Sequence, residues 1–179
     1  MQFFLLAATL FLTTAAIRGD SNLANRRAPG FAVVDNALQY RDLADYRGQP
    51  VLLDLIQTTC PHCQALTKAI VKAKQKYGDK IAVLTIVVPP DTTNTVAAFV
   101  KEYGVTTPVL FDCGQVAAAY AKVDPRKPSL SFPHLFMIDG QGIIRSHFGP
   151  GAESEGVSQV PALTKEIDRL LAPAPVTKK

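Results

Sequence analysis

The fold is decided by residues 51–88, which read VLLDLIQTTCPHCQALTKAIVKAKQKYGDKIAVLTIVV. The nearly continuous apolar runs at 51–56 and 81–88 are typical of strands buried on both faces of a sheet. Between them, residues 61–77 place apolar side chains at helical spacing, and Gly78 follows as a typical helix stop. A strand, a helix and a second strand in this order form a βαβ unit, so we expect the two strands to be parallel and joined by a right-handed crossover.

Beyond this unit, helical and strand patterns continue towards the end of the chain. Helices are expected at 93–103, at 114–122 and from near Ser158 to Leu171, and strands at 109–111, 135–138 and 143–148. The DGQG sequence between the last two strands predicts a β-hairpin. This order of elements predicts an α/β fold in which a central mixed β-sheet is flanked by helices on both faces.

The two ends of the chain differ in character from its body. The chain has 179 residues, which suits one domain. Residues 1–17 carry an uncharged apolar run that is shorter than the ~20 residues of a membrane span, so we interpret them as a signal peptide or a short anchor. Residues 18–27 are interpreted as a linker, 28–172 as the folded domain and 173–179 as a disordered Pro-rich tail. We therefore expect an extracytoplasmic protein, periplasmic or secreted, whose only membrane contact is a retained N-terminal anchor.

The net charge of +4 comes from the ends of the chain. Five basic residues lie outside 28–172 and are opposed there by a single acidic residue, so the body of the chain is electrically balanced. A nucleic-acid-binding domain carries its basic surplus on the folded surface. Nucleic acid is therefore excluded as a partner, and nothing in the composition calls for more than a monomer.

The motif that carries chemistry is Cys60-Pro61-His62-Cys63, at the expected start of the first helix. The free N–H groups and the positive end of the helix dipole favour a thiolate at Cys60. Pro61 suits the first helical position, and Cys63 lies one turn further on, within reach of a disulfide. A cationic His62 adds to the stabilisation of the thiolate, which makes the disulfide a stronger oxidant.

Two other uses of a CxxC pair remain open at this point. A structural disulfide between Cys60 and Cys63 closes too small a loop to stabilise the chain much. A metal site needs further ligands, and His134 and His147 are the remaining histidines besides His62. Because CxxC at a strand-to-helix junction is typical of redox sites, we expect redox chemistry with the disulfide itself as the redox group, no organic cofactor and no metal.

Several segments in order resemble one family. The APGF sequence at 28–31, DLADYRGQPVLL at 42–53 and FPHLFMIDGQG at 132–142 are similar to the opening, the first central strand and the hairpin of the extracytoplasmic thioredoxin-like proteins of the TlpA/ResA type, within the redoxin, AhpC/TSA-like, group. The CPHC sequence itself matches the disulfide oxidase DsbA. The resemblance implies a thioredoxin-like fold and a thiol-disulfide oxidoreductase, with protein thiols or disulfides as substrates and a redox partner protein.

The resemblance also implies roles for residues outside the motif. Asp54, inside the first buried strand, stands where thioredoxins carry the proton acceptor for the second cysteine; a structural role is the alternative. Pro133 is expected to follow a cis peptide bond that exposes the backbone of Phe132 to substrate, and Phe132 is expected to act as an apolar lip or as a core aromatic. Thr59 and Leu66 depart from the family pattern in a way that favours oxidation or isomerisation over a role in cytochrome c maturation.

The remaining sulfur and imidazole groups receive plainer interpretations. We expect Cys113 to be buried and unreactive, with a third redox thiol as the alternative. His134 is expected to face solvent, with tuning of the thiolate or contact with a metal as the alternative, and His147 is expected to be structural or solvated. Two other functions stay open: a redoxin-type thiol peroxidase, and a copper-handling protein that uses Cys60, Cys63 and His134 as ligands.

Overall fold

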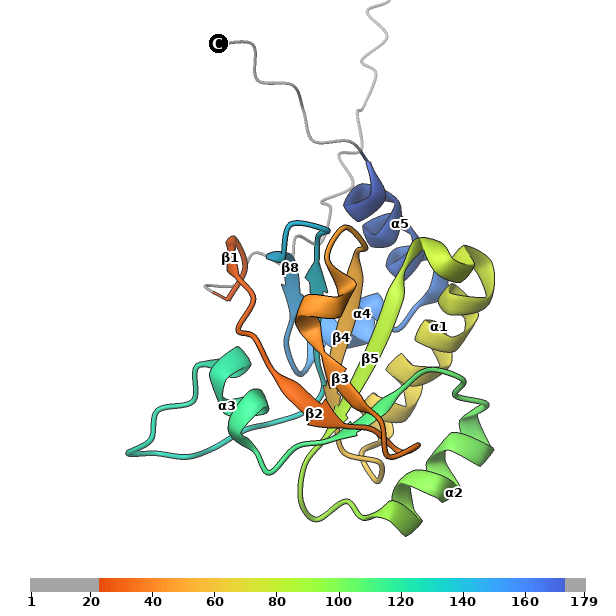
Figure 1. The fold of residues 1–179 in the computed structure, drawn as a ribbon. Helices are drawn as coiled ribbons and strands as arrows, with labels where there is room; N and C mark the ends of the chain where they lie inside the picture. The colour runs from red at the N-terminus through yellow and green to blue at the C-terminus, as the bar shows by residue number, and fades with distance from the viewer. Residues whose placement is uncertain (1–22, 173–179) are drawn as a thin grey trace, which may run out of the picture.

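The computed structural model describes residues 23–172 and centres on a six-stranded sheet in the order β1-β8-β7-β4-β5-β6 (Figure 1). Its strands are β1 (Arg26–Arg27), β4 (Val51–Ile56), β5 (Ala82–Val87), β6 (Val109–Phe111), β7 (His134–Ile138) and β8 (Ile143–Phe148). Strands β4, β5 and β6 pair in parallel. The pairs β4–β7, β7–β8 and β8–β1 are antiparallel. The sheet is therefore mixed, as the sequence predicts.

The central strands β4 and β5 are buried along their whole length. Alternate residues of β4 point to opposite faces: Leu53 packs in the apolar cluster on one face, and Leu52 packs in the cluster beneath α1 (Pro61–Tyr77) on the other. Burial on both faces explains why these two segments read as continuous apolar runs rather than as alternating ones.

Helices cover both faces of this sheet (Figure 1). On one face lie α1, α2 (Thr93–Tyr103) and α5 (Val160–Leu171), and α1 packs against both of the other helices. The other face is covered by α3 (Gln115–Ala121) and by a separate hairpin of β2 (Ala32–Val34) and β3 (Tyr40–Asp42). Two short 3₁₀ turns, Leu43–Tyr46 and Gly78–Lys80, and a short helix α4 (Ala152–Val157) complete the fold.

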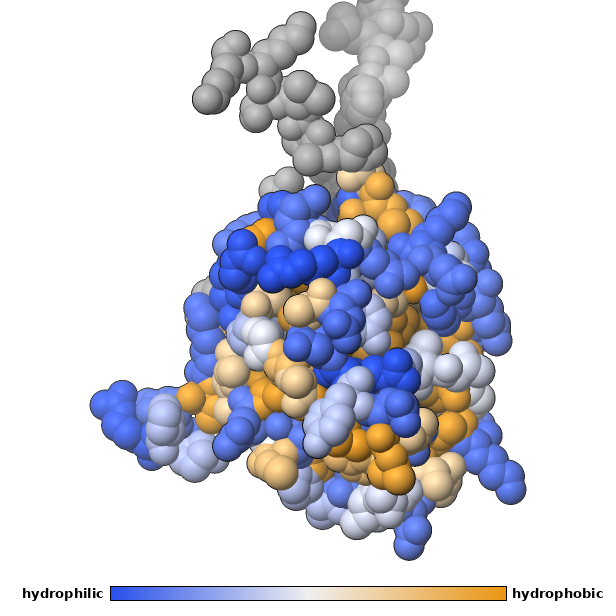
Figure 2. Space-filling view, viewed as in Figure 1, coloured by the Kyte–Doolittle hydropathy of each residue, from blue (hydrophilic) through white to orange (hydrophobic). Residues whose placement is uncertain are grey.

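The surface on the side of this hairpin mixes hydrophilic and hydrophobic side chains (Figure 2). The large apolar side chains that are most exposed in residues 23–172 are Leu38 and Tyr40, at the tip of the β2–β3 hairpin. Neither lies in the segments that form the candidate site below.

The interpretation of residues 18–27 as a linker is wrong for its described part. Leu23 and Ala24 are buried, and Arg26 and Arg27 form β1, which pairs with Ile144 and Ile143 of β8. The sequence gives no apolar periodicity here because β1 joins the sheet through its backbone and lies at the edge, where charged side chains are tolerated. The interpretations of residues 1–17 and 173–179 lie outside the described residues. Within 23–172 no helix is both long and apolar enough to cross a membrane.

Helix α4 was not predicted, and α5 begins at Val160, two residues after the expected start. The segment before α5 contains Gly149, Pro150 and Gly151, which lower its local helix propensity. Helix α4 forms because its residues Ser154 and Val157 are buried and because the helix packs on α1 and β8. Tertiary packing therefore overrides local propensity in this segment.

Candidate functional site

The cysteine pair lies at the first turn of α1. Cys60 is the N-cap residue with extended backbone angles (φ −81°, ψ 119°), and Pro61 is the first helical residue. The Sγ atom of Cys60 accepts a hydrogen bond from the backbone N–H of Cys63, with 3.4 Å between sulfur and nitrogen. A sulfur that caps the start of a helix has the kind of surroundings in which reactive cysteines are found.

The two sulfurs differ in access. Cys60 is half-buried, Cys63 is fully buried, and both are free thiols. Burial raises the pKa of the Cys63 thiol far above its ordinary value, and the hydrogen bond with Cys60 raises it further. Cys60 is therefore the sulfur that another molecule can reach, while Cys63 keeps its proton until a base removes it.

Asp54 lies behind the pair, in the middle of β4 and only 1% exposed. The hydroxyl of Thr85 donates to its Oδ1 atom at 2.8 Å, and its Oδ2 atom has no hydrogen-bond partner among the described residues. Burial raises the pKa of the carboxyl to about 7, against the opposing effect of the Thr85 hydrogen bond. The charge of Asp54 in turn raises the pKa of Cys63, so the two groups interact. A carboxyl that titrates near neutral pH is suited to accept a proton there.

The segment opposite Cys60 precedes β7 and contains the cis Phe132–Pro133 peptide bond, which confirms the expected isomer. The carbonyl oxygen of Phe132 lies 4.0 Å from the Sγ atom of Cys60. The ring of Phe132 is half-buried and packs against two apolar clusters, one of which also contacts Cys60. Its ring therefore contacts the core, while its backbone carbonyl faces the Cys60 sulfur.

A half-buried carboxylate that the sequence interpretation missed, Asp91, holds the loop before Cys60. The backbone N–H of Thr58 donates to Oδ2 of Asp91 at 2.9 Å, and the Thr58 hydroxyl donates to Oδ1. On the other side, the side-chain amide of Gln64 donates to the Thr58 carbonyl at 2.9 Å. The sequence position of Asp91 could have indicated this contact. Asp91 follows the end of β5, and the carboxyl ends of neighbouring parallel strands lie at the same edge of the sheet, where Cys60 also lies.

His62 is exposed on the outer side of the same turn. Its Nδ1 atom lies 3.8 Å from Oε1 of Glu155 in α4, and both side chains are 59% exposed. An exposed pair of this kind adds little stability. It does place the Glu155 carboxylate next to the imidazole of His62, which belongs to the same motif as Cys60. The sequence could not indicate Glu155, because α4 was not predicted.

The expectation that His134 faces solvent is wrong. His134 is 8% exposed, and its Nδ1 atom lies 2.8 Å from Nε2 of His147, which is 3% exposed. The reason is the strand register. His134 pairs with Leu55 of the central strand β4, so the two side chains lie on the same buried face of the sheet. His147 is structural rather than solvated, which was one of its two expected states.

The expectation that Cys113 is buried is also wrong, because its side chain is exposed. Asp112 takes the buried position and accepts hydrogen bonds from the backbone N–H groups of Val116 and Ala117 at the start of α3. The turn that this arrangement requires leaves Cys113 outside. Cys113 follows β6 and Cys60 follows β4, so both lie along the edge where the parallel strands end.

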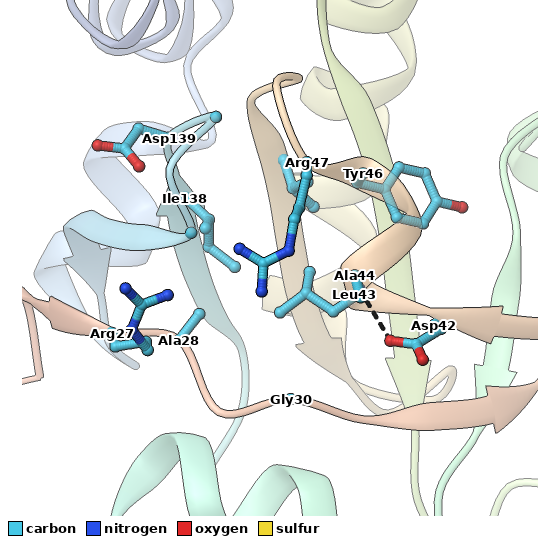
Figure 3. A pocket seen from close by; sticks show the side chains of 13 residues that line it. Arg27, Ala28, Gly30, Asp42, Leu43, Ala44, Tyr46, Arg47, Ile138 and Asp139 are labelled. Carbon is cyan, nitrogen blue, oxygen red and sulfur yellow. Dashed lines mark hydrogen bonds between the residues drawn. The ribbon is translucent and has the colours of Figure 1, made fainter.

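Two further features lie apart from the cysteine pair. In residues 23–172, no group of three or more Cys, His, Asp or Glu side chains is arranged to hold a metal ion. A hollow at the opposite end of β4 and β7 is lined by Val51, Ile138 and Tyr46, with the guanidinium groups of Arg27 and Arg47 turned towards it (Figure 3). It contains none of the predicted site residues.

The amino-acid sequence matches a known protein family and two groups of bacterial relatives. The model of the AhpC/TSA family matches residues 24–147. The chain belongs to the AhpC/TSA family. Among its relatives, the thioredoxin-like protein YneN of Bacillus subtilis is 28% identical over 133 residues, which cover 73% of this chain and 74% of YneN. The thiol-disulfide oxidoreductase ResA of Bacillus thuringiensis is 29% identical over 117 residues, 65% of this chain and 64% of ResA, so the match spans just under two thirds of that relative.

The fold of this AhpC/TSA-family chain is also found in solved structures. A thiol:disulfide interchange protein of the thioredoxin family from Chlorobium tepidum superposes with a TM-score of 0.66 and 17% identity, covering 83% of this chain and 97% of that one. At that identity the likeness concerns the fold alone. Together, the comparisons confirm the redoxin resemblance and the thioredoxin-like α/β fold, and the AhpC/TSA-family chain is a thioredoxin-like oxidoreductase.

Proposed function

We propose that this AhpC/TSA-family chain exchanges disulfides with extracytoplasmic protein thiols through Cys60 and Cys63. The observation that carries the proposal is the asymmetry of the pair: a reachable sulfur at the start of α1, and a buried, protonated one directly beneath it. This asymmetry supports a reaction in which one sulfur meets the substrate and the other acts only inside the protein. The uncharged N-terminal run at 3–17 supports export.

In the oxidising direction, a substrate thiolate attacks Cys60 of the Cys60–Cys63 disulfide. The bond between the two protein sulfurs breaks, a bond between substrate and Cys60 forms, and Cys63 leaves as a thiolate that takes a proton. The second thiolate of the substrate then attacks its own sulfur in the mixed disulfide and releases Cys60. Two electrons and two protons pass from the substrate dithiol to the protein, and no organic cofactor is needed.

In the reducing direction, the thiolate of Cys60 attacks one sulfur of a substrate disulfide: the substrate S–S bond breaks, a mixed disulfide with Cys60 forms, and the other substrate sulfur leaves as a thiolate that takes a proton from solvent. Cys63 must then lose its proton before it can attack Cys60, and its raised pKa makes this the difficult step. Asp54, whose pKa burial raises to about 7, is suited to take that proton. The second substrate sulfur leaves as a thiolate that gains a proton from solvent, which completes the two-electron exchange.

The backbone at Phe132 supports a protein or peptide as the substrate. Its carbonyl lies beside the reachable sulfur, 4.0 Å from the Cys60 Sγ atom. An extended segment that carries a cysteine can pair with such a backbone group, so that main-chain hydrogen bonds orient the sulfur without a need for a particular side chain. The half-buried ring of Phe132 adds an apolar contact at the same place.

The proposal is tested with the full-length protein and a fluorescent peptide that carries either a dithiol or a disulfide. We expect exchange in both directions, loss of turnover in Cys60→Ser, and a trapped mixed disulfide at Cys60 in Cys63→Ser. Cys113→Ser is the matched control, because this exposed thiol lies outside the pair, and it should exchange at the wild-type rate. Consumption of hydrogen peroxide that requires Cys60 but not Cys63, with no peptide exchange, overturns the proposal in favour of a thiol peroxidase.

The direction of physiological electron flow is tested by the reduction potential of the pair. We propose the oxidising direction, because the CPHC motif places an imidazole beside Cys60 and because Thr59 and Leu66 depart from the pattern of reductive relatives. A potential well above the −270 mV of thioredoxin supports an oxidant. A potential at or below that value contradicts this part of the proposal.

A further inference from the structure

Behind the Phe132 backbone lies a pair of buried histidines that the exchange reaction does not use. His134 and His147 face each other with 2.8 Å between Nδ1 of the first and Nε2 of the second, and their ring centroids lie 5.1 Å apart. The ring of Phe136 packs against His147 at 4.5 Å between centroids. A hydrogen bond between two ring nitrogens needs one donor and one acceptor, so this contact exists only while at least one of the two imidazoles is neutral.

The pair is tied to the segment that faces Cys60. His134 is the first residue of β7, and it follows Pro133 directly. Its ring also hydrogen-bonds to the backbone of Ser131, on the other side of the Phe132–Pro133 bond. The imidazole of His134 therefore joins both ends of the short segment 131–133 to β8, where His147 lies.

The turn after β8 closes over the two rings. The backbone N–H of Gly149 donates to Oε2 of Glu153 in α4 at 2.8 Å, and a Cβ atom at Gly149 would stand 3.4 Å from Cε1 of His147. The charged groups that act on the pair come from two elements. Glu153 favours the protonated form of His134, and Arg26 of β1 disfavours the protonated form of His147.

We propose that the His134–His147 pair is a positioning device for substrate exchange: in its neutral, hydrogen-bonded form it holds segment 131–133 so that the Phe132 carbonyl stands opposite Cys60. Protonation of both rings breaks the pair and releases the segment. Docking of an extended peptide is then lost, although the sulfur itself still reacts with small molecules. This inference rests on the proposed exchange function and adds the group that governs peptide docking.

The surroundings set the direction of the pH dependence. Burial lowers the pKa of His134, and burial followed by the charges of His134 and Arg26 lowers the pKa of His147 to about 4. Both rings are therefore neutral at pH 7 and above. Because both pKa values are lowered from the ordinary 6.5, the stabilising contact is complete above about pH 6.5 and is lost as the pH falls through about 4, where the second ring is protonated.

The test compares a disulfide that carries a peptide backbone with one that carries none. The reduced protein attacks a fluorescent peptide disulfide, which needs docking at Phe132, and bis(2-hydroxyethyl) disulfide, which does not. Since both reactions use the same Cys60 thiolate, the ratio of the two second-order rate constants cancels the ionisation of the sulfur. In the wild type we expect this ratio to fall about tenfold between pH 7.5 and pH 3, about one pH unit below the pKa of His147, and this factor corresponds to about 1.4 kcal/mol.

Two substitutions at one position separate positioning from general stability. His147→Gln keeps a polar group near the place of Nε2 and should retain the wild-type ratio at pH 7.5 within about threefold, whereas His147→Leu should lower it about tenfold, through a higher KM for the peptide. The proposal is overturned if the wild-type ratio does not change with pH, or if His147→Leu keeps the wild-type ratio at pH 7.5. The wild-type profile decides the matter even if His147→Leu does not fold. A wild type that attacks neither disulfide overturns the proposed function itself, and the inference with it.

Discussion

Replacing Asp54 with Asn should make the protein more stable above neutral pH. The carboxyl lies in the middle of a central strand with one oxygen bonded to Thr85 and the other without a partner among residues 23–172. Ionisation therefore places an uncompensated charge in the interior, which is costly. Asparagine has the same shape, keeps an acceptor for Thr85 and cannot ionise, so it removes that cost and leaves the packing in place.

The size of the effect follows from the pKa of Asp54. Burial raises it from 3.8 to about 7, and at 1.36 kcal/mol per pKa unit a shift of about three units corresponds to about 4 kcal/mol. Because the folded protein holds this proton more tightly than the unfolded chain, the contribution of Asp54 to stability is greatest below about pH 4, falls as the pH rises to about 7, and is level above that. Allowing for relaxation around the charge, we expect Asp54→Asn to gain about 2–4 kcal/mol at pH 8 and almost nothing at pH 4.

The assay is urea unfolding of the reduced proteins at pH 4, 6 and 8. Asp35→Asn is a control of opposite sign. Burial raises the pKa of Asp35, but hydrogen bonds from Gln39, Arg41 and Ala37 outweigh it, so the pKa is lowered. Asp35→Asn should therefore destabilise the protein at pH 7, with a smaller loss at pH 3. If Asp54→Asn is no more stable than the wild type at pH 8, or its gain does not shrink towards pH 4, the buried carboxyl does not ionise as argued.

Three further predictions concern the site and the core. His62→Ala should lower the reduction potential of the cysteine pair by about 10–30 mV, because it removes the imidazole that, when protonated, favours the thiolate of the neighbouring Cys60. Glu155→Gln should raise the potential, because it removes the carboxylate that faces this imidazole and whose negative charge opposes the thiolate. Glutathione redox titration measures both shifts, and shifts of the same sign would refute this assignment of charge effects. Leu53→Ala empties a fully buried position of the central strand and should cost about 2–5 kcal/mol in urea unfolding; a loss below 1 kcal/mol contradicts the packing described. Phe132→Ala should raise the KM for a peptide disulfide several-fold and leave the rate with bis(2-hydroxyethyl) disulfide unchanged; an equal fall in both rates would assign the ring to the core alone.

The sequence predicts the elements whose local signal agrees with their tertiary environment. Helix α1 spans Pro61–Tyr77 as expected, because Cys60 and Pro61 supply a start, Gly78 supplies an end, and the apolar spacing between them matches the buried face. The same agreement holds for β4 and for α2, whose ends also coincide with the prediction. The candidate pair lies where the sequence places it for the same reason: the CPHC motif and the start of the helix are both contained in consecutive residues.

The elements that the sequence did not predict depend on contacts between distant segments. Strand β1 is two arginines held by backbone pairing with β8, and α4 is a glycine-flanked turn held by packing on α1. The histidine pair could not be deduced from the hairpin alone: a regular hairpin closed by residues 139–142 would pair Phe136 with Arg145, and a register shift between Met137 and Ile138 brings His147 opposite Phe136 instead. The sequence indicates only that His134 shares the face of Phe136, two residues away. The contact between the two histidines was therefore missed.

The central claim is that the sulfur of Cys60 reacts because it caps a helix, and the rate of its alkylation tests this most directly. The chain offers an internal reference, since Cys113 is an exposed thiol that caps no helix and Cys63 is buried. With iodoacetamide at pH 6.5, and peptide mapping by mass spectrometry, the account predicts that Cys60 of the reduced protein is modified at least about tenfold faster than Cys113, and Cys63 more slowly than both. Equal rates for Cys60 and Cys113 across the pH range would contradict it.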